Sequence, residues 1–166
     1  MLDSATFADL PAVAALVNAA YRGESARQGW THEADYLVNP RTNVGMLADD
    51  LARTGVRLLV VRDNGGGVLG CVQLEPAGDD AWYLGMLTVR PDLQAAQLGR
   101  SILAETEALA RLAGVRRMRM TVVGRRDTLI AWYQRRGYVL TGETQPFAFA
   151  GEVRPDLTFV VLEKIL

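Results

Sequence analysis

Hydrophobic residues in the first third of the chain recur three and four positions apart, which is the spacing of one helix face. This pattern covers residues 10–21 and ends before Arg22, and Thr6 and Asp9 stand in front of it like the two ends of a capping box. A weaker pattern covers residues 42–53. We therefore expect two helices, joined by an irregular connection over residues 24–41 that is unusually long for a compact domain.

From residue 56 onward, alternating hydrophobic and polar positions predict strands. Three of them, separated by glycine-rich turns, favour an antiparallel meander. The expected elements are strands over 2–5, 56–62, 68–75, 81–89, 117–123, 138–142 and 157–162, and helices over 10–21, 42–53, 99–113 and 128–136. Their order, β-α-α-β-β-β-α-β-α-β-β, predicts a mixed sheet in a single α+β domain spanning residues 1–166.

The composition agrees with one ordinary globular domain, because the 166 residues are 49% hydrophobic and 22% charged. The single cysteine, Cys71, excludes an internal disulfide and a cysteine metal cluster, and it is typical of a reducing compartment. The first residues lack the basic segment of a signal peptide, and no low-charge run is long enough to span a membrane. We therefore expect a cytoplasmic protein with no metal and no membrane partner.

The charge distribution is more informative than the net charge of −1. The segment from Arg90 to Arg136 holds ten arginines against four acidic residues, whereas the rest of the chain holds eight basic and fifteen acidic residues. Lys164 is the only lysine, so a coding preference for arginine over lysine explains the type of cation in this chain. Such a preference does not explain why the arginines concentrate in one segment. This segment is suited to an anionic ligand, while the overall acidity argues against a nucleic-acid partner.

The range 84–103 predicts a strand, a turn and the start of a helix. The first amides of a helix have no acceptor within it and attract anions. Gly99 allows close approach of a ligand to the backbone, and Arg100 adds a fixed charge. The simpler interpretation is a helix that begins after a loop, with Gly99 there for packing.

Two motifs in this region carry a family resemblance. Gln94 and Gly99 match the ends of the pattern Gln/Arg-x-x-Gly-x-Gly/Ala, with Gln97 at the place of the middle glycine. The range 129–138 is similar to a second motif, in which a tyrosine, here Tyr133, precedes Gly-Phe/Tyr, and Arg126 stands where an asparagine is usual. These are motifs A and B of the GNAT superfamily of acyl-CoA-dependent N-acyltransferases. The ranges 21–24, 29–31 and 154–157 further resemble a bacterial branch of it without an assigned substrate.

The resemblance implies a fold and a reaction. The fold is a mixed, mostly antiparallel central sheet with helices on both faces. The reaction is N-acetyltransfer, in which acetyl-CoA and an amine bind together and the amine attacks the thioester directly. The acceptor is a small-molecule or peptide amine. The sequence leaves the oligomeric state open, and family members often form homodimers.

The resemblance also implies the site residues. The cofactor would bind at the end of strand 81–89, at the start of the following helix and at position 126, where the motif usually has asparagine. The residues at these places are Leu87, Thr88, Val89, Gln94, Ala95, Ala96, Gln97, Leu98, Gly99, Arg100, Ser101 and Arg126. Gly85 is the expected position of a strand bulge, unless it serves tight packing. Tyr133 is the expected general acid, although an aromatic pair with Trp132 is also typical of a core.

The irregular connection is expected to bind the acceptor through Tyr21, Arg22, Trp30 and Thr31, with Glu24 as the general base. A surface ion pair between Arg22 and Glu24 is the alternative interpretation. Other candidates for the base are His32, Glu33, Asp35, Glu75 and ordered water.

Other functions find less support in the sequence. No Gly-x-Ser-x-Gly motif indicates a serine hydrolase, and the glycines at 65–67 lack the Gly-Lys-Ser/Thr ending of a phosphate-binding loop. The remaining alternative is a non-catalytic module, either an acyl-CoA sensor or an RNA-binding protein that uses the basic surface of residues 116–126.

Overall fold

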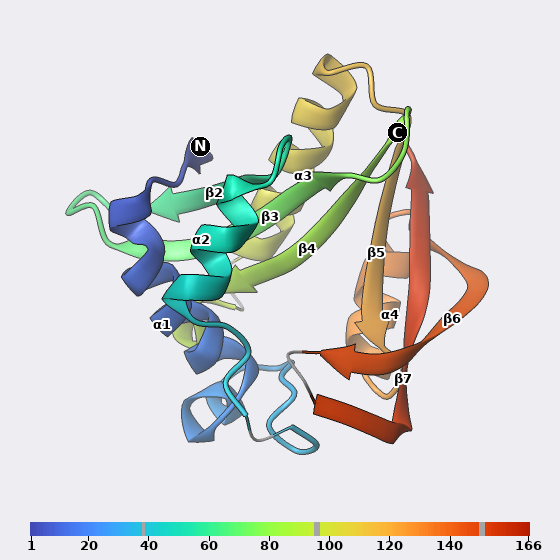
Figure 1. The fold of residues 1–166 in the computed structure, drawn as a ribbon, viewed down its shortest axis with the longest axis horizontal. Coiled ribbons are helices and arrows are strands. Elements are labelled where there is room, and N and C mark those ends of the chain that lie inside the picture. Colours follow the sequence, from blue (N-terminus) through green and yellow to red (C-terminus); the bar gives the residue numbers. More distant parts are fainter. Residues whose placement is uncertain (38, 95–96, 150–151) are drawn as a thin grey trace.

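The computed structural model describes residues 1–37, 39–94, 97–149 and 152–166. Seven strands form one mixed sheet in the order β1-β2-β3-β4-β5-β7-β6 (Figure 1). The strands are β1 (Asp3–Ser4), β2 (Arg57–Arg62), β3 (Val68–Pro76), β4 (Ala81–Val89), β5 (Arg117–Val123), β6 (Val139–Phe149) and β7 (Glu152–Ile165). The α-helices are α1 (Leu10–Tyr21), α2 (Val44–Ala52), α3 (Leu98–Leu112) and α4 (Asp127–Gln134), and the 3-10 helices are η1 (Phe7–Asp9), η2 (Glu24–Gln28) and η3 (Pro91–Leu93).

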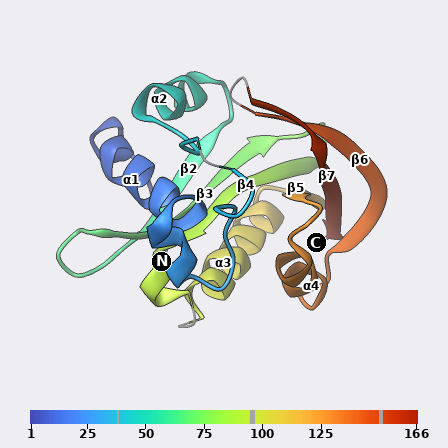
Figure 2. The same cartoon turned by 90° about the horizontal axis from the view of Figure 1, so that it is seen from below.

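Helices cover both faces of the sheet, as expected. Figure 2 shows α1 and α2 on one face and α3 and α4 on the other. The apolar stripe of α1 packs on β2 and β3 in one core cluster, which includes Val13, Val17, Val60 and Cys71. On the opposite face, α3 and α4 pack over β3, β4, β5 and β7 in a larger cluster. The sequence-predicted α+β architecture is confirmed.

The sheet parts between β4 and β5, its one parallel pair among the described residues. These strands pair only at Ala81 with Arg117, Trp82 with Met118, and Tyr83 with Arg119. Beyond this point they diverge, as the green and orange arrows in Figure 1 show. The Tyr83 hydroxyl still meets the Thr121 hydroxyl across the opening, at 2.6 Å. The divergence leaves a V-shaped gap in the middle of the sheet.

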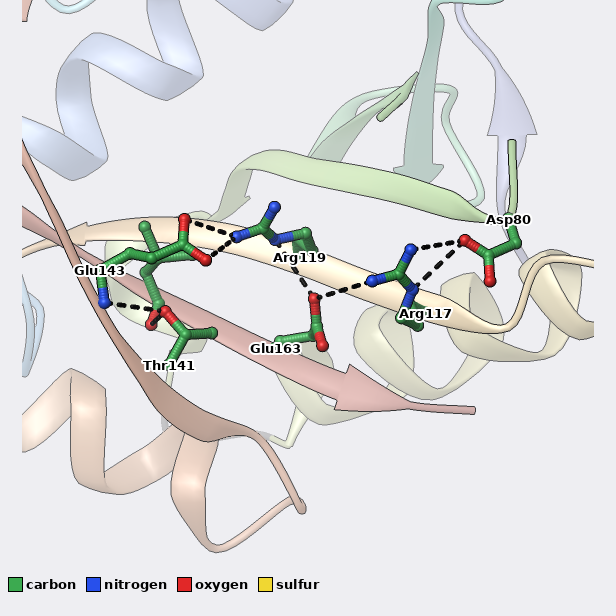
Figure 3. Close-up of polar contacts among 7 residues, drawn as sticks. Asp80, Arg117, Arg119, Thr141, Glu143 and Glu163 are labelled. Atoms are coloured by element: carbon green, nitrogen blue, oxygen red, sulfur yellow. Dashed lines mark hydrogen bonds and ion pairs between the residues drawn. The ribbon is translucent and has the colours of Figure 1, made fainter. Parts of the chain in front are cut away.

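An ion-pair ladder holds the closed end of this gap (Figure 3). Arg117 donates to Asp80 at 2.7 Å, just before β4, and Glu163 on β7 lies 3.8 Å from Arg117 and 3.3 Å from Arg119. Arg119 also donates to both carboxylate oxygens of Glu143 on β6, at 2.7 and 2.8 Å. The ladder therefore links the start of β4 to β5, β7 and β6.

The last two strands are longer than predicted. The expectation of strands over 138–142 and 157–162 is wrong in length, because β6 and β7 extend to the ends of their hairpin at Phe149 and Glu152. Gly142 and Pro146 lie inside β6, although both residue types are uncommon within strands. The register shifts between Leu140 and Thr144 and again between Pro146 and Ala148, so bulges absorb these residues. Proline is tolerated here because β6 is an edge strand.

The bulge of β4 lies one residue beyond the expected Gly85. Between Cys71 and Gln73 the register with β3 shifts, so that Met86 and Leu87 face a single residue of β3. Met86 has a φ of 52°, in the left-handed region. Such a conformation costs a non-glycine residue about 1–3 kcal/mol, and it persists only where the surroundings impose it.

A membrane-spanning helix is not present in the described part of the chain, where no helix is both long and apolar enough.

Candidate active site

Two cavities open at the gap and share a wall. The first has a volume of about 220 Å³ and lies between the end of β4, the start of α3 and α4. The second has a volume of about 550 Å³ and extends between β4 and β5 toward α2 and the β6–β7 hairpin. The residues that line both are Tyr21, Leu87, Arg126, Leu129 and Tyr133. A group at this junction is accessible from both sides.

The start of α3 forms one side of the first cavity. Gln97 adopts a φ of 66° there, so glutamine takes the left-handed conformation for which the motif usually supplies glycine. Leu98 and Gly99 follow as the first helical residues, whose amides have no acceptor within the helix by position. A Cβ at Gly99 would lie 3.5 Å from Val89 and 3.9 Å from Trp132, so a methyl group fits but a longer side chain enters the cavity.

Cationic side chains crowd the other side of the first cavity. The guanidinium of Arg136 lies 3.6 Å from the centroid of the Trp132 ring, and its Nε is buried without a hydrogen-bond partner in the described residues. Burial, Arg100 and Arg135 together lower the pKa of Arg136. Among the described residues, no carboxylate forms an ion pair with Arg100, Arg135 or Arg136. An anion bound in the cavity would offset this repulsion.

Tyr133 stands at the junction of the cavities. Its ring is buried and packs edge-on against Trp132 and Tyr138, with centroids 5.0 and 5.6 Å away. Its hydroxyl has no hydrogen-bond partner in the part of the chain that the structure describes. Burial raises the pKa of Tyr133 far above its usual value, so the phenol keeps its proton at neutral pH. The structure thus leaves a protonated hydroxyl available to a ligand.

Arg126 belongs to a buried network between the long connection and α4. Glu33 is only 5% exposed and accepts from Arg22 at 3.3 Å and from Arg126 at 3.1 Å. Arg126 also donates to the Thr31 hydroxyl at 2.8 Å. The network holds the segment from Thr31 to Glu33 against the N-terminus of α4. Because Arg126 lines both cavities, it also remains part of their walls.

The structure does not bring Glu24 to the site. Its carboxylate is 91% exposed on η2, outside both cavities, and pairs with Arg27 instead of Arg22. Asp35 pairs with the same arginine at the surface. His32 also lies outside both cavities. Of the sequence-predicted bases, Glu33 and Glu75 line the second cavity, and the Glu75 carboxylate lies 2.8 Å from Arg53.

The other sequence-predicted residues divide between the cavities. Trp30 and Thr31 line the first cavity, not the second, and the Trp30 amide donates to the Gln94 side chain at 3.0 Å. Arg22 lines the second cavity. Predicted residues that line the first cavity are Leu87, Thr88, Val89, Gln94, Gln97, Gly99, Arg100 and Arg126, whereas Leu98 and Ser101 line neither. Ala95 and Ala96 lie outside the described residues.

Sequence reasoning missed several wall residues. Trp132 lies on α4 and Arg136 lies two residues beyond its end, and their spacing of four within the predicted helix 128–136 indicates a shared face. No comparable signal marks Met46, Gln145 and Phe147, which reach the second cavity from α2 and β6 only because of the tertiary fold.

Comparison with known families decides the assignment. The model of the acetyltransferase (GNAT) domain matches residues 54–140, more than half of the chain. The chain belongs to the GNAT acetyltransferase family. No match to a curated protein was found.

Solved structures resemble this GNAT acetyltransferase over its whole length or over about three quarters of it. A ribosomal-protein-alanine N-acetyltransferase from Brucella melitensis is 24% identical, with a TM-score of 0.70 over 100% of this chain and 99% of that one. The PaiA N-acetyltransferase from Thermoplasma acidophilum, in complex with coenzyme A, is 13% identical, with a TM-score of 0.74 over 100% and 98%. A GNAT acetyltransferase from Elizabethkingia anophelis with acetyl-CoA bound is 16% identical, with a TM-score of 0.61 over 74% and 82%.

Three arginines of the basic surface considered for RNA form ion pairs in this GNAT acetyltransferase. Arg117 and Arg119 are held in the ion-pair ladder, and Arg126 is buried against Glu33. Within the arginine-rich segment, Arg117 and Arg119 therefore form structural ion pairs on β5, whereas Arg100, Arg126 and Arg136 line the first cavity.

Proposed function

We propose that this protein transfers an acetyl group from acetyl-CoA to an amine by direct attack in a ternary complex. The observation that carries the proposal is the meeting of two cavities at Tyr133. One cavity has the character of an anion site, and the other is large enough for a small acceptor or the end of a peptide. Direct transfer needs both substrates bound at once with their reacting atoms together.

The residues of the first cavity fit a coenzyme A moiety. Its pyrophosphate would meet the amides at the start of α3, where Gly99 leaves room and Arg100 supplies charge. Arg136 and Trp132 offer a cation and an aromatic face beside it. The relatives with coenzyme A or acetyl-CoA bound are similar to this chain in fold and support the same ligand.

Tyr133 is the proposed general acid. Acetyl-CoA supplies the acetyl group as a thioester, and transfer breaks its C–S bond while a C–N bond forms. The departing thiolate takes a proton, since free thiols have a pKa of about 8.5. The protonated phenol of Tyr133 can donate this proton. The amine releases one proton to solvent in the same reaction, and the Tyr133 phenolate regains one proton from solvent, so the protons balance.

The proposed route for the amine proton runs through water in the second cavity. Both oxygens of Glu33 accept from arginines, which leaves it little capacity as a base. Glu75 is a quarter exposed and lies in the same cavity, on the sheet face that also bears Gln73. Our proposal is therefore that water carries the amine proton to Glu75, and that Glu24 is not the base.

Acetyl-CoA binding and thiol release test the proposal together. A ligand at one hundred times its dissociation constant stabilises a protein by about 2.7 kcal/mol, so acetyl-CoA should raise the melting temperature by several degrees. Thiol release should then follow with a member of a panel of amino acids, polyamines, aminoglycosides and peptides. Binding without thiol release for any amine favours an acyl-CoA sensor, and absence of binding at millimolar ligand contradicts the proposal.

A further inference from the structure

The backbone of the β4 bulge faces the junction of the cavities, and its orientation depends on side chains. The carbonyl of Met86 accepts from the Thr88 hydroxyl at 2.9 Å and from the Cys71 thiol at 3.8 Å. The carbonyl of Leu87 accepts from the Tyr21 hydroxyl at 3.2 Å. Side chains therefore bind the carbonyls of both bulge residues.

The contacts of the Met86 carbonyl set the direction of the Leu87 N–H. Cys71 packs in the core under α1, and Thr88 is its partner across the strands, so both donors lie on the face covered by α1. The Met86 carbonyl is drawn to that face. Within one planar peptide unit the C=O and N–H groups point in opposite directions. The N–H of Leu87 therefore points away from α1, toward the face that carries α4 and Tyr133.

Tyr21 is fixed in place on the α1 side of the bulge. It is the last residue of α1, and its own carbonyl accepts from the Glu33 amide at 2.7 Å. The guanidinium of Arg126 lies 5.4 Å from the centroid of its ring, and that of Arg41 lies 5.6 Å away. Burial raises the pKa of Tyr21, so its hydroxyl is a donor at neutral pH.

We propose that Tyr21 is a positioning residue that holds the Leu87 carbonyl on the α1 side, away from the thioester oxygen. The Leu87 N–H, whose direction the contacts of the Met86 carbonyl set, is then the backbone group that donates to this oxygen. This inference rests on the proposed function, because it concerns acetyl-CoA at the junction. A carbonyl oxygen turned toward the reacting group would repel the negative charge that develops there. The Tyr21 hydroxyl prevents this, so its effect on the reaction passes through the backbone of Leu87.

The test compares Tyr21→Phe with a matched control, Tyr36→Phe. Phenylalanine keeps the ring of Tyr21 between its neighbours and removes only the hydroxyl. Tyr36 belongs to the same connection, lines neither cavity, and its hydroxyl makes no hydrogen bond with the described residues. The readout is the ¹³C chemical shift of the thioester carbonyl in bound [1-¹³C]acetyl-CoA, which reports carbonyl polarisation.

We expect Tyr21→Phe to bind acetyl-CoA with unchanged affinity and to return the carbonyl shift toward its value in free acetyl-CoA. Removal of a direct oxyanion donor costs about 10²–10³ in rate, and we expect about tenfold in kcat for this indirect effect, with KM unchanged. Tyr36→Phe should match the wild type. Equal carbonyl shifts in Tyr21→Phe and the wild type, or equal losses in both variants, would overturn the inference.

A second measurement separates this inference from the proposed function. In the ligand-free protein, Tyr21→Phe should move the backbone amide resonance of Thr88, because the Thr88 N–H shares a peptide unit with the Leu87 carbonyl, whereas Tyr36→Phe should not. If acetyl-CoA fails to bind the wild type, the proposed function fails, and the amide measurement still decides whether Tyr21 orients the bulge. An unmoved Thr88 resonance overturns the inference independently of any ligand.

Discussion

Glu33→Gln should destabilise the protein strongly, because it removes the single carboxylate shared by two buried arginines. The exposed fractions of the Arg22, Glu33 and Arg126 side chains are 4%, 7% and 8%, so water can replace little of the lost interaction. Removal of one partner of a buried ion pair costs about 3–5 kcal/mol. Glutamine retains one acceptor oxygen, so we expect about 3 kcal/mol, which lowers the melting temperature of a domain of this size by roughly 6–12 °C.

Thermal unfolding followed by circular dichroism measures this effect, with two controls from the same connection. Glu24→Gln and Asp35→Asn also remove carboxylates that pair with an arginine, but those pairs are exposed and should contribute little. The controls should melt within about 2 °C of the wild type, given the small contribution of exposed pairs. If Glu33→Gln melts as the controls do, the buried network does not stabilise the connection and our account of it is refuted.

Three further outcomes are expected. Gly99→Glu should abolish the thermal shift produced by acetyl-CoA, whereas Gly99→Ala, whose methyl group fits at 3.5 Å from Val89, should retain it; a normal shift in Gly99→Glu would place the phosphates elsewhere. Tyr133→Phe should bind acetyl-CoA normally and turn over about 10²–10⁴-fold more slowly, as measured by thiol release, and wild-type turnover would make this tyrosine structural. Burial raises the pKa of Cys71 to about 12, so the stabilising contribution of the buried thiol is complete below about pH 9 and is lost as the pH rises toward 12. Melting temperatures across that range should fall more steeply for the wild type than for Cys71→Ala, and parallel curves would contradict this.

Local chemistry explains why the first cavity could be predicted from the sequence. Many of its wall residues lie between Leu87 and Arg136, where the sequence carries a strong local signal, whereas Tyr21, Trp30 and Thr31 come from the N-terminal part of the chain. Gln97 shows that the motif predicts backbone conformation even where the residue type differs. The motif position has the left-handed conformation even though glutamine replaces glycine there.

The acceptor side could be predicted only in part. Glu24 and Glu33 lie in the same connection, where no periodic pattern shows which side chain turns inward. Their burial is decided by Arg22 and Arg126, and Arg126 lies 93 residues from Glu33 along the chain. The β6–β7 hairpin was predicted too short for a related reason, since bulges allow glycine and proline within strands that the sequence pattern ends.

The parting of β4 and β5 has a consequence for how the molecule unfolds. The chain through α3 builds one block, with β1 to β4, and the remainder builds a second block, with β5 to β7 and α4. The two blocks share three pairs of strand residues, so side-chain packing and the ion-pair ladder carry most of their connection. Partial unfolding in proteins follows such boundaries between cooperative units. A molecule lodged across the gap would therefore join the blocks, and the native state would unfold more nearly as one unit when it is bound.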